Sequence, residues 1–443
     1  MIRTTLLAAT AAAALTAFPA AAQTDPHAGH AGHTPAPSPA PAQDHGQHHP
    51  APAADDQSGE FYNYARKPRN SAGSGTARLP GAEGGMHGLH LASGDWMVMA
   101  HGSVLAAYTD QGGPRGDEKF YTGSMAMLAA ERDFGAAKLT LHTMFSLDPV
   151  NGQRGYPNLF ASGETAHGQP LVDRQHPHDL FMELTARIDV PLGSGVSGFL
   201  YGGPVGEPAL GPSAFVHRRS ARYLPLSPIG HHWFDSTHVT YGVVTAGVAT
   251  DGLQLEASAF KGEEPDERRW GIDTPRLDSW SVRATWSPTP NWTAQISHGR
   301  LKEPEPLHPG EDERRTTASV HYARGGFSAM AGFSAKDRVP GETLTAWIGE
   351  ANWNVTDRHS VFGRVENVAN AELFPDHSDP LHDVKFRIAR FEAGYAYRIP
   401  LTDNVELALG GSAAAYAKPA ALDAAYGRRP LSYTVFARLA LGD

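Results

Sequence analysis

The sequence predicts an all-β protein, a transmembrane antiparallel up-and-down β-barrel of about 16 strands, preceded by a disordered His- and Pro-rich N-terminal segment. Three observations predict this class. Amphipathic segments with a period of two run from about residue 95 to the C-terminus. Short and long connections alternate between these segments, and an export signal stands at the N-terminus.

Residues 1–22 have the pattern of a secretory signal peptide. Arg3 supplies the positive charge, Leu6 to Phe18 forms a short apolar run, and Ala20–Ala22 provides small residues for cleavage. We therefore expect export, with cleavage before Gln23. No later run approaches the ~18 uncharged apolar residues that a transmembrane helix needs.

Residues 23–85 are predicted to be a disordered His/Pro/Ala-rich segment and a polar linker, because they offer almost nothing to bury. The histidines of this segment are His27, His30, His33, His45, His48 and His49. Such a tract can bind copper or zinc weakly. A plain spacer is the alternative.

The third predicted region, residues 86–443, is the barrel itself. The short turns are expected at 133–136, 191–196, 250–252, 287–291, 323–326, 356–359 and 400–404. The long loops are expected at 109–118, 149–178, 203–236, 262–278, 301–314, 336–342, 370–384 and 417–429. This alternation of short and long connections is typical of barrels that cross a membrane with strands.

Within the predicted strands one face is apolar and the other polar. From Trp96 to Tyr108 every second residue is apolar or small, with an aromatic ring at each end. A similar outward set is Leu180, Met182, Leu184, Ala186 and Ile188. The opposite faces carry Glu183, Arg187, Glu256, Arg283, Gln295, Arg364, Glu366 and Arg438, which suit a wet lumen. A secreted protein of stacked sheets stays the rival interpretation, because hairpin patterning alone does not separate the two.

On this architecture residues 86–443 resemble Gram-negative outer-membrane β-barrels of the porin and channel type. The resemblance implies an outer-membrane location, contact with membrane lipid and lipopolysaccharide, and passage of small solutes or metal ions through an aqueous lumen. It leaves a homo-oligomer open. The chain departs from the usual terminal aromatic residue, since it ends on Leu439-Ala-Leu-Gly-Asp443. The N-terminal segment is similar in composition to those of His-rich copper-resistance barrels.

Composition excludes several other classes. The net charge is -10 and the pI about 6.1, with no basic stripe, so no nucleic-acid partner is expected. There is no cysteine, which excludes disulfides and thiolate metal sites.

Two long loops concentrate histidine beside carboxylates. The first ends in Asp173, His176, His178 and Asp179, and the second in His231, His232, Asp235 and His238. Imidazole with carboxylate suits zinc or copper(II), and both sets should lie at the extracellular rim. The alternative is a hydrogen-bonded scaffold in which Arg174 and Arg218 pair with Asp173 and Asp179. Loop 203–236 is long enough to fold inward and narrow the pore, or to remain on the surface.

A second candidate cluster lies on the inward face of the first strands. It contains Met97, Met99, His101, Met125, Met127, His142 and Met144, and Met330 shares the inward phase on a later strand. Thioether and imidazole ligands together select copper(I). The alternative is that the methionines pack against an infolded loop. Copper or zinc is thus the only cofactor that the sequence suggests.

A hydrolase at the rim is the alternative from another class. The rim histidines and aspartates could activate water, and Ser236 lies between Asp235 and His238 as an available nucleophile. The sequence shows no Gly-x-Ser-x-Gly elbow. A channel or binding barrel is therefore preferred over an enzyme.

Overall fold

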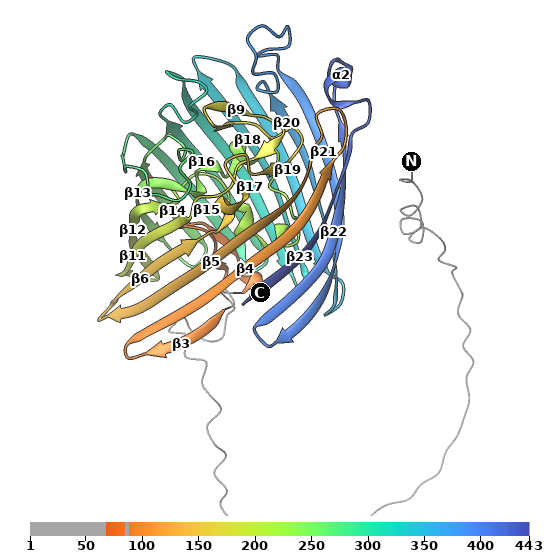
Figure 1. The fold of residues 1–443 in the computed structure, drawn as a ribbon. Coiled ribbons are helices and arrows are strands. Elements are labelled where there is room, and N and C mark those ends of the chain that lie inside the picture. Colours follow the sequence, from red (N-terminus) through yellow and green to blue (C-terminus); the bar gives the residue numbers. More distant parts are fainter. Residues whose placement is uncertain (1–67, 85–87, 443) are drawn as a thin grey trace, which may run out of the picture. The chain divides into compact units, whose positions relative to one another are not determined.

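The computed structural model describes residues 68–84 and 88–442, and within them the chain forms a closed antiparallel barrel of sixteen long strands (Figure 1). The fold class and the strand number predicted from the sequence are confirmed. The predicted signal peptide and the His-rich segment over 23–67 lie outside the described residues. No helix among the described residues is long and apolar enough to cross a membrane.

The sixteen strands follow one another around the barrel in chain order. They are β4 (Trp96–Gln111), β5 (Glu118–Phe134), β6 (Ala137–Phe145), β11 (Phe181–Gly193), β12 (Val196–Gly206), β13 (Thr240–Ala249), β14 (Leu253–Phe260), β15 (Ser279–Thr289), β16 (Trp292–Leu301), β17 (Asp312–Arg324), β18 (Phe327–Val339), β19 (Thr343–Asn354), β20 (His359–Asn370), β21 (Phe386–Thr402), β22 (Val405–Ala417) and β23 (Leu431–Leu441). The seven short turns are confirmed, and the connections at the other end are longer except at 340–342.

The short elements lie in the connections and before the first long strand. They are β1 (Asn70–Ala72), β2 (Arg78–Pro80), η1 (Gly81–Glu83), β3 (Leu89–Ser93), η2 (Asp148–Asn151), β7 (Tyr156–Pro157), β8 (Glu164–Ala166), β9 (Gln169–Leu171), β10 (Arg174–Gln175), η3 (Phe215–His217), η4 (Arg219–Ala221), α1 (His231–Phe234), η5 (Ser236–His238), η6 (Ala420–Leu422) and α2 (Asp423–Tyr426).

The barrel closes where the last strand meets the first long one. β23 pairs with β4 from Leu441↔Gly102 to Ser432↔Gln111. The rest of the same β4 edge pairs with β3, from Leu89↔Ala100 to Ser93↔Trp96. One edge of β4 is therefore shared between the end of the barrel and a short strand that precedes it, and it has partners along almost its whole length.

The outer face of the barrel is apolar, as the alternation of side chains predicts. Phe120 is 79% exposed and Trp286 59%, and aliphatic side chains such as Val104, Leu128 and Val365 are also exposed there. An apolar belt around a closed barrel requires a bilayer and does not suit stacked sheets in water. The stacked-sheet alternative is therefore wrong.

One residue of the predicted outward set points inward. Met182 is fully buried, whereas Ala186 and Ile188 on the same strand are exposed. The register between β11 and β6 shifts between Phe181 and Glu183, which is a β-bulge. A bulge adds a residue and so reverses the side on which the next side chain lies. The simple period of two therefore fails at the start of β11.

Residues 68–84 pack inside the barrel, so the predicted linker up to residue 85 is wrong for this part. We call them the N-terminal plug. Thr76 O accepts a hydrogen bond from Gln254 Nε2 at 2.8 Å, and Thr76 Oγ1 accepts one from Arg283 Nη2 at 3.0 Å. Glu83 accepts one from Ser328 at 3.1 Å. Ala82 N donates to Pro290 O in the short turn between β15 and β16, so the plug lies toward the short-turn end.

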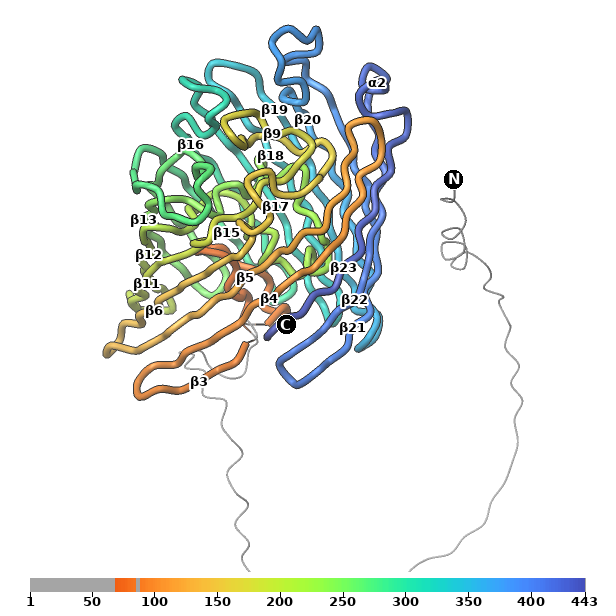
Figure 2. Tube along the Cα trace, in the orientation of Figure 1, coloured from red at the N-terminus to blue at the C-terminus, as the bar shows by residue number. Residues whose placement is uncertain are grey.

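The connection between β12 and β13, residues 207–239, also folds into the barrel, and we call it the infolded segment (Figures 1 and 2). It is anchored on the inner face of β18–β20. Arg218 Nε donates to Glu350 at 2.7 Å, Gly230 N donates to Glu366 at 3.0 Å, and Trp233 O accepts from Ser334 at 2.5 Å. The infolded alternative for this loop is therefore confirmed, and it carries one set of candidate histidines into the lumen.

Candidate metal centre

The two predicted histidine loops meet inside the barrel, where five imidazoles form one cluster. His176 and His178 come from the segment before β11, and His231, His232 and His238 come from the infolded segment. The ring centroids are 5.1 Å apart for His178–His238, 5.2 Å for His231–His238 and 6.0 Å for His176–His232. The sequence placed both sets at the extracellular rim, which is wrong, because the structure brings them together inside the barrel and buries all but His178 almost completely.

Glu164, from β8, joins this cluster and was not predicted. Its Oε1 lies 3.0 Å from His176 Nε2, and possible ligand atoms of Glu164, His176 and His232 all lie within 4.8 Å of one another. The three residues are buried. A carboxylate with two imidazoles is a ligand set that zinc and copper(II) accept.

The contact between His176 and Glu164 lacks the geometry of a hydrogen bond. His176 Nδ1 lies 3.0 Å from Pro177 O and donates its proton there, while Nε2 has no hydrogen-bond partner among the described residues. Burial lowers the pKa of this imidazole to about 4, although Glu164 opposes the shift, so the ring is neutral at pH 7. Two lone-pair acceptors thus face each other at 3.0 Å, an arrangement that a cation between them would stabilise.

The other rings are oriented through Nδ1. His178 Nδ1 donates to Asp148 at 2.8 Å, His231 Nδ1 to the Asp235 carboxylate at 2.9 Å, and His238 Nδ1 to the Asp235 carbonyl at 2.6 Å. The buried Nε2 atoms of His178 and His238 have no hydrogen-bond partner among the described residues. Metal-ligating histidines are oriented in this way, with Nδ1–H on an oxygen and Nε2 free for the ion.

His232 is oriented by a different carboxylate from its neighbours, that of Glu264. Its Nδ1 donates to Glu264 at 3.0 Å. Burial alone would lower the pKa of this imidazole, but Glu264, together with Glu164 and Glu305, outweighs burial and raises the pKa to about 9. His232 is therefore protonated at neutral pH without a metal, and an ion would replace its proton.

The three predicted aspartate ligands have other partners. Asp173 lies 2.8 Å from Arg115, Asp179 3.2 Å from Arg269, and Asp235 2.8 Å from Arg218. The expected pairs of Arg174 and Arg218 with Asp173 and Asp179 are therefore wrong. We assign the three aspartates to positioning the loops and, through Asp235, two of the histidine rings.

The predicted methionine face points into the lumen. Across β4, β5 and β6 the register aligns His101 with Met127 and Met127 with Met144, so these side chains form a row at one height. His101 Nε2 lies 3.2 Å from Met127 Sδ. Met125 precedes Met127 by two residues on the same face, and His142 Nδ1 lies 3.6 Å from Glu183. Met97 and Met99 lie on the same face of β4, nearer to its short-turn end.

Another group of possible ligands lies on the long-loop side. His308 Nε2 lies 3.7 Å from Glu372 and 3.8 Å from Glu305. The Lys336 ammonium is hydrogen-bonded to Glu305, so a cation already neutralises this group. We therefore interpret it as a buried ion-pair network.

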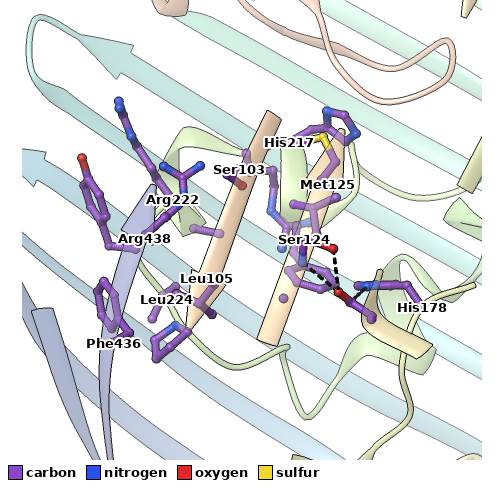
Figure 3. Close-up of a pocket in the computed structure, with 18 of the residues that line it drawn as sticks. Ser103, Leu105, Ser124, Met125, His178, His217, Arg222, Leu224, Phe436 and Arg438 are labelled. Atoms are coloured by element: carbon purple, nitrogen blue, oxygen red, sulfur yellow. Dashed lines mark hydrogen bonds and ion pairs between the residues drawn. The ribbon is translucent and has the colours of Figure 1, made fainter. Parts of the chain in front are cut away.

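A cavity of about 170 Å³ borders the histidine cluster (Figure 3). His178, His217 and Met125 contribute to its wall, together with Arg222 and Arg438. Asp148 connects His178 to this wall, because the same carboxylate accepts a hydrogen bond from Ser124 N at 2.7 Å. The cluster therefore lies beside a space large enough for several water molecules.

The hydrolase alternative finds no support in this geometry. Ser236 Oγ accepts a hydrogen bond from Arg315 at 3.0 Å. His238 directs Nδ1 to the Asp235 carbonyl, and its Nε2 has no hydrogen-bond partner among the described residues, so neither nitrogen activates this serine.

Fold and lumen together define a transmembrane barrel whose interior is occupied by infolded chain. Salmonella typhi OmpF, solved in complex with daunomycin, is similar with a TM-score of 0.52 and 8% identity, over 80% of this chain and 100% of that one. Pseudomonas putida OprB has a TM-score of 0.49 and 11% identity, over 78% of this chain and 94% of its own. An anion-selective porin from Comamonas acidovorans has 0.48 and 12%, over 78% and 100%.

At such identities the likeness to OmpF shows the fold alone: the chain has the fold of an outer-membrane porin. No protein-family model matches the sequence, and no curated protein matches it.

Proposed function

We propose that this protein is an outer-membrane barrel of the porin and channel class that binds a divalent copper or zinc ion in its lumen. The ligands are Glu164, His176 and His232. The observation that carries the proposal is the contact between the neutral His176 Nε2 and Glu164 Oε1, 3.0 Å apart with no hydrogen bond between them.

The filled lumen supports selective binding rather than free passage of solutes. A barrel of sixteen strands is wide enough for an aqueous channel. Here the N-terminal plug and the infolded segment take up much of that width, and both are held by buried hydrogen bonds. Small solutes and metal ions that enter the lumen therefore contact imidazole, carboxylate and thioether groups rather than a continuous column of water.

The apolar belt supports the proposed location. Exposed aromatic and aliphatic side chains around the barrel need acyl chains as their solvent. Membrane lipid and lipopolysaccharide are accordingly the proposed neighbours of the outer face.

Elemental analysis and metal titration of the full-length protein in detergent test the metal site. We expect one tightly bound zinc or copper(II) ion per chain. Glu164→Gln and His176→Asn should each weaken binding by about 10- to 100-fold or more, since a removed ligand costs at least as much as a removed ligand-orienting group. Unchanged binding in both variants would contradict the proposal.

The matched control is a second pair of neighbouring histidines outside the cluster. The rings of His377 and His382 lie 4.3 Å apart in the loop between β20 and β21. His382→Ala should leave the affinity unchanged. Equal loss in this control would show that binding is spread over surface histidines.

A further inference from the structure

A very small cavity lies next to the five-histidine cluster and has a different lining. Its volume is about 10 Å³, and its walls include Met144, Met182, His217 and His238. Ser74, Glu183 and Glu207 complete the polar part of the wall. A space of this size holds about one water molecule or one ion.

The two thioethers reach this cavity from adjacent strands. Met144 belongs to the inward row of β6, and the bulge at the start of β11 turns Met182 to the same side. Their exposed fractions are 3% and 0%. Without the bulge, Met182 would face lipid.

The two imidazoles come from the infolded segment. The Nε2 atoms of both His217 and His238 are buried and have no hydrogen-bond partner among the described residues. Burial lowers the pKa of His217 to about 4, and that of His238 well below its ordinary value. Both rings are therefore neutral at pH 7, with His101, His142 and Glu183 as the titratable neighbours of His217. A neutral imidazole nitrogen without a proton donor is a ready ligand.

Packing explains only part of this arrangement. Met127, Met144 and Met182 form an apolar cluster with Val205, Val239 and Tyr241, which accounts for their burial. Packing does not account for two buried imidazole nitrogens without partners beside the same cavity. Each such atom costs free energy unless something binds it.

We propose that Met144, Met182, His217 and His238 form a binding site for a soft monovalent cation of the copper(I) class. Thioether and imidazole together favour copper(I), whereas zinc binds thioether poorly. Glu183 would offset the positive charge from the wall. This inference adds a second class of ion to the proposed function. It rests on the proposed function because it requires that metal ions reach the lumen.

The test uses the full-length protein in detergent under anaerobic conditions, titrated with copper(I) against a chromophoric chelator and, separately, with silver(I). X-ray absorption at the copper edge reports whether sulfur is bound. We expect one copper(I) per chain with sulfur in its coordination shell. The Met144→Leu/Met182→Leu variant keeps the side-chain volume and should lose the sulfur signal and at least tenfold in affinity.

Met330→Leu is the matched control. Met330 lies on β18 and is also inward and buried, but it belongs to a different apolar cluster, which contains Trp233 and Phe234. It should bind as the wild type does. Copper(I) bound without sulfur, or bound equally by the double variant, would overturn the inference. His217→Asn provides a second check that leaves the five-histidine cluster intact, and unchanged affinity there would also count against it.

The experiments distinguish the proposed divalent site from the proposed copper(I) site. Glu164→Gln should lose zinc or copper(II) yet keep copper(I) with sulfur. Zinc binding without copper(I) binding would support the proposed function and overturn the second site, while copper(I) binding without a divalent site would do the opposite.

Discussion

Single buried charges hold the infolded segment in place. Arg218 is 2% exposed, and it contacts Asp235 at 2.8 Å and Glu350 at 2.7 Å. Arg364 approaches the same Glu350 at 3.3 Å. Because these groups have left water, each depends on its partners, and removing one exposes the other to the full cost of burial.

We expect Arg218→Met to lower the free energy of unfolding by about 3–5 kcal/mol, because it leaves two buried carboxylates short of a counter-ion. Urea or thermal unfolding in detergent, followed by circular dichroism, measures the loss. Adding Glu350→Gln to the same variant should recover part of it. Arg300→Met removes a half-exposed partner of Asp312 and should cost less than about 1 kcal/mol. A loss as large as that of Arg218→Met would refute the assignment.

At the scale of the elements, the sequence predicts strands better than it predicts connections. A strand such as β4 repeats every two residues, so its inward face follows from the sequence alone. The partners of a loop have no such rule. Glu164 and His232 meet across 68 positions of the chain, and neither is preceded by a pattern that points to the other. Met182 shows the limit within a strand, since one bulge reverses its side.

The N-terminal plug carries its own pH dependence. Burial raises the pKa of Glu83 to about 7, with Arg219 opposing the shift and Glu350 adding to it. The docked plug therefore holds a proton that a released plug would lose. By linkage this contribution is complete below about pH 4.5 and is lost as the pH rises through about 7, with a total of at most about 3 kcal/mol.

Hydrogen exchange of residues 68–84 measures this effect, after correction for the intrinsic pH dependence of exchange. Protection should fall between pH 5 and pH 8 in the wild type. Glu83→Gln cannot ionise, so its protection should stay constant over that range. Parallel loss in both proteins would assign the change to another group.

At the scale of the whole molecule, the chain that fills the lumen determines how the barrel acts as a channel. Closure, strand number and the apolar belt follow from alternation and turn spacing. The filling of the lumen does not follow from these patterns. The plug and the infolded segment are polar and irregular in sequence, and their burial depends on polar and charged side chains of distant strands.

Removing the plug should raise ion conductance. Deletion of residues 23–84 takes the plug away from the short-turn end of the barrel, and a sixteen-stranded barrel is wide enough to conduct when its interior is freed. Single-channel recording in planar bilayers should show a several-fold increase over the wild type. Deletion of 23–67 alone keeps the plug and should conduct as the full chain does. An increase in this control would transfer the blocking role to the earlier residues.

The pairing of β23 with β4, which closes the barrel, has a consequence for the order in which the protein is assembled. The infolded segment is anchored to β18–β20, yet its histidines reach the methionines of β6 and β11 on the other wall. Those walls become one enclosure only after β23, the last of the sixteen strands in chain order, pairs with β4. The proposed ion sites are therefore not assembled in a nascent or half-inserted chain. On the proposed function, metal loading follows insertion, and a bound ion marks the sealed barrel.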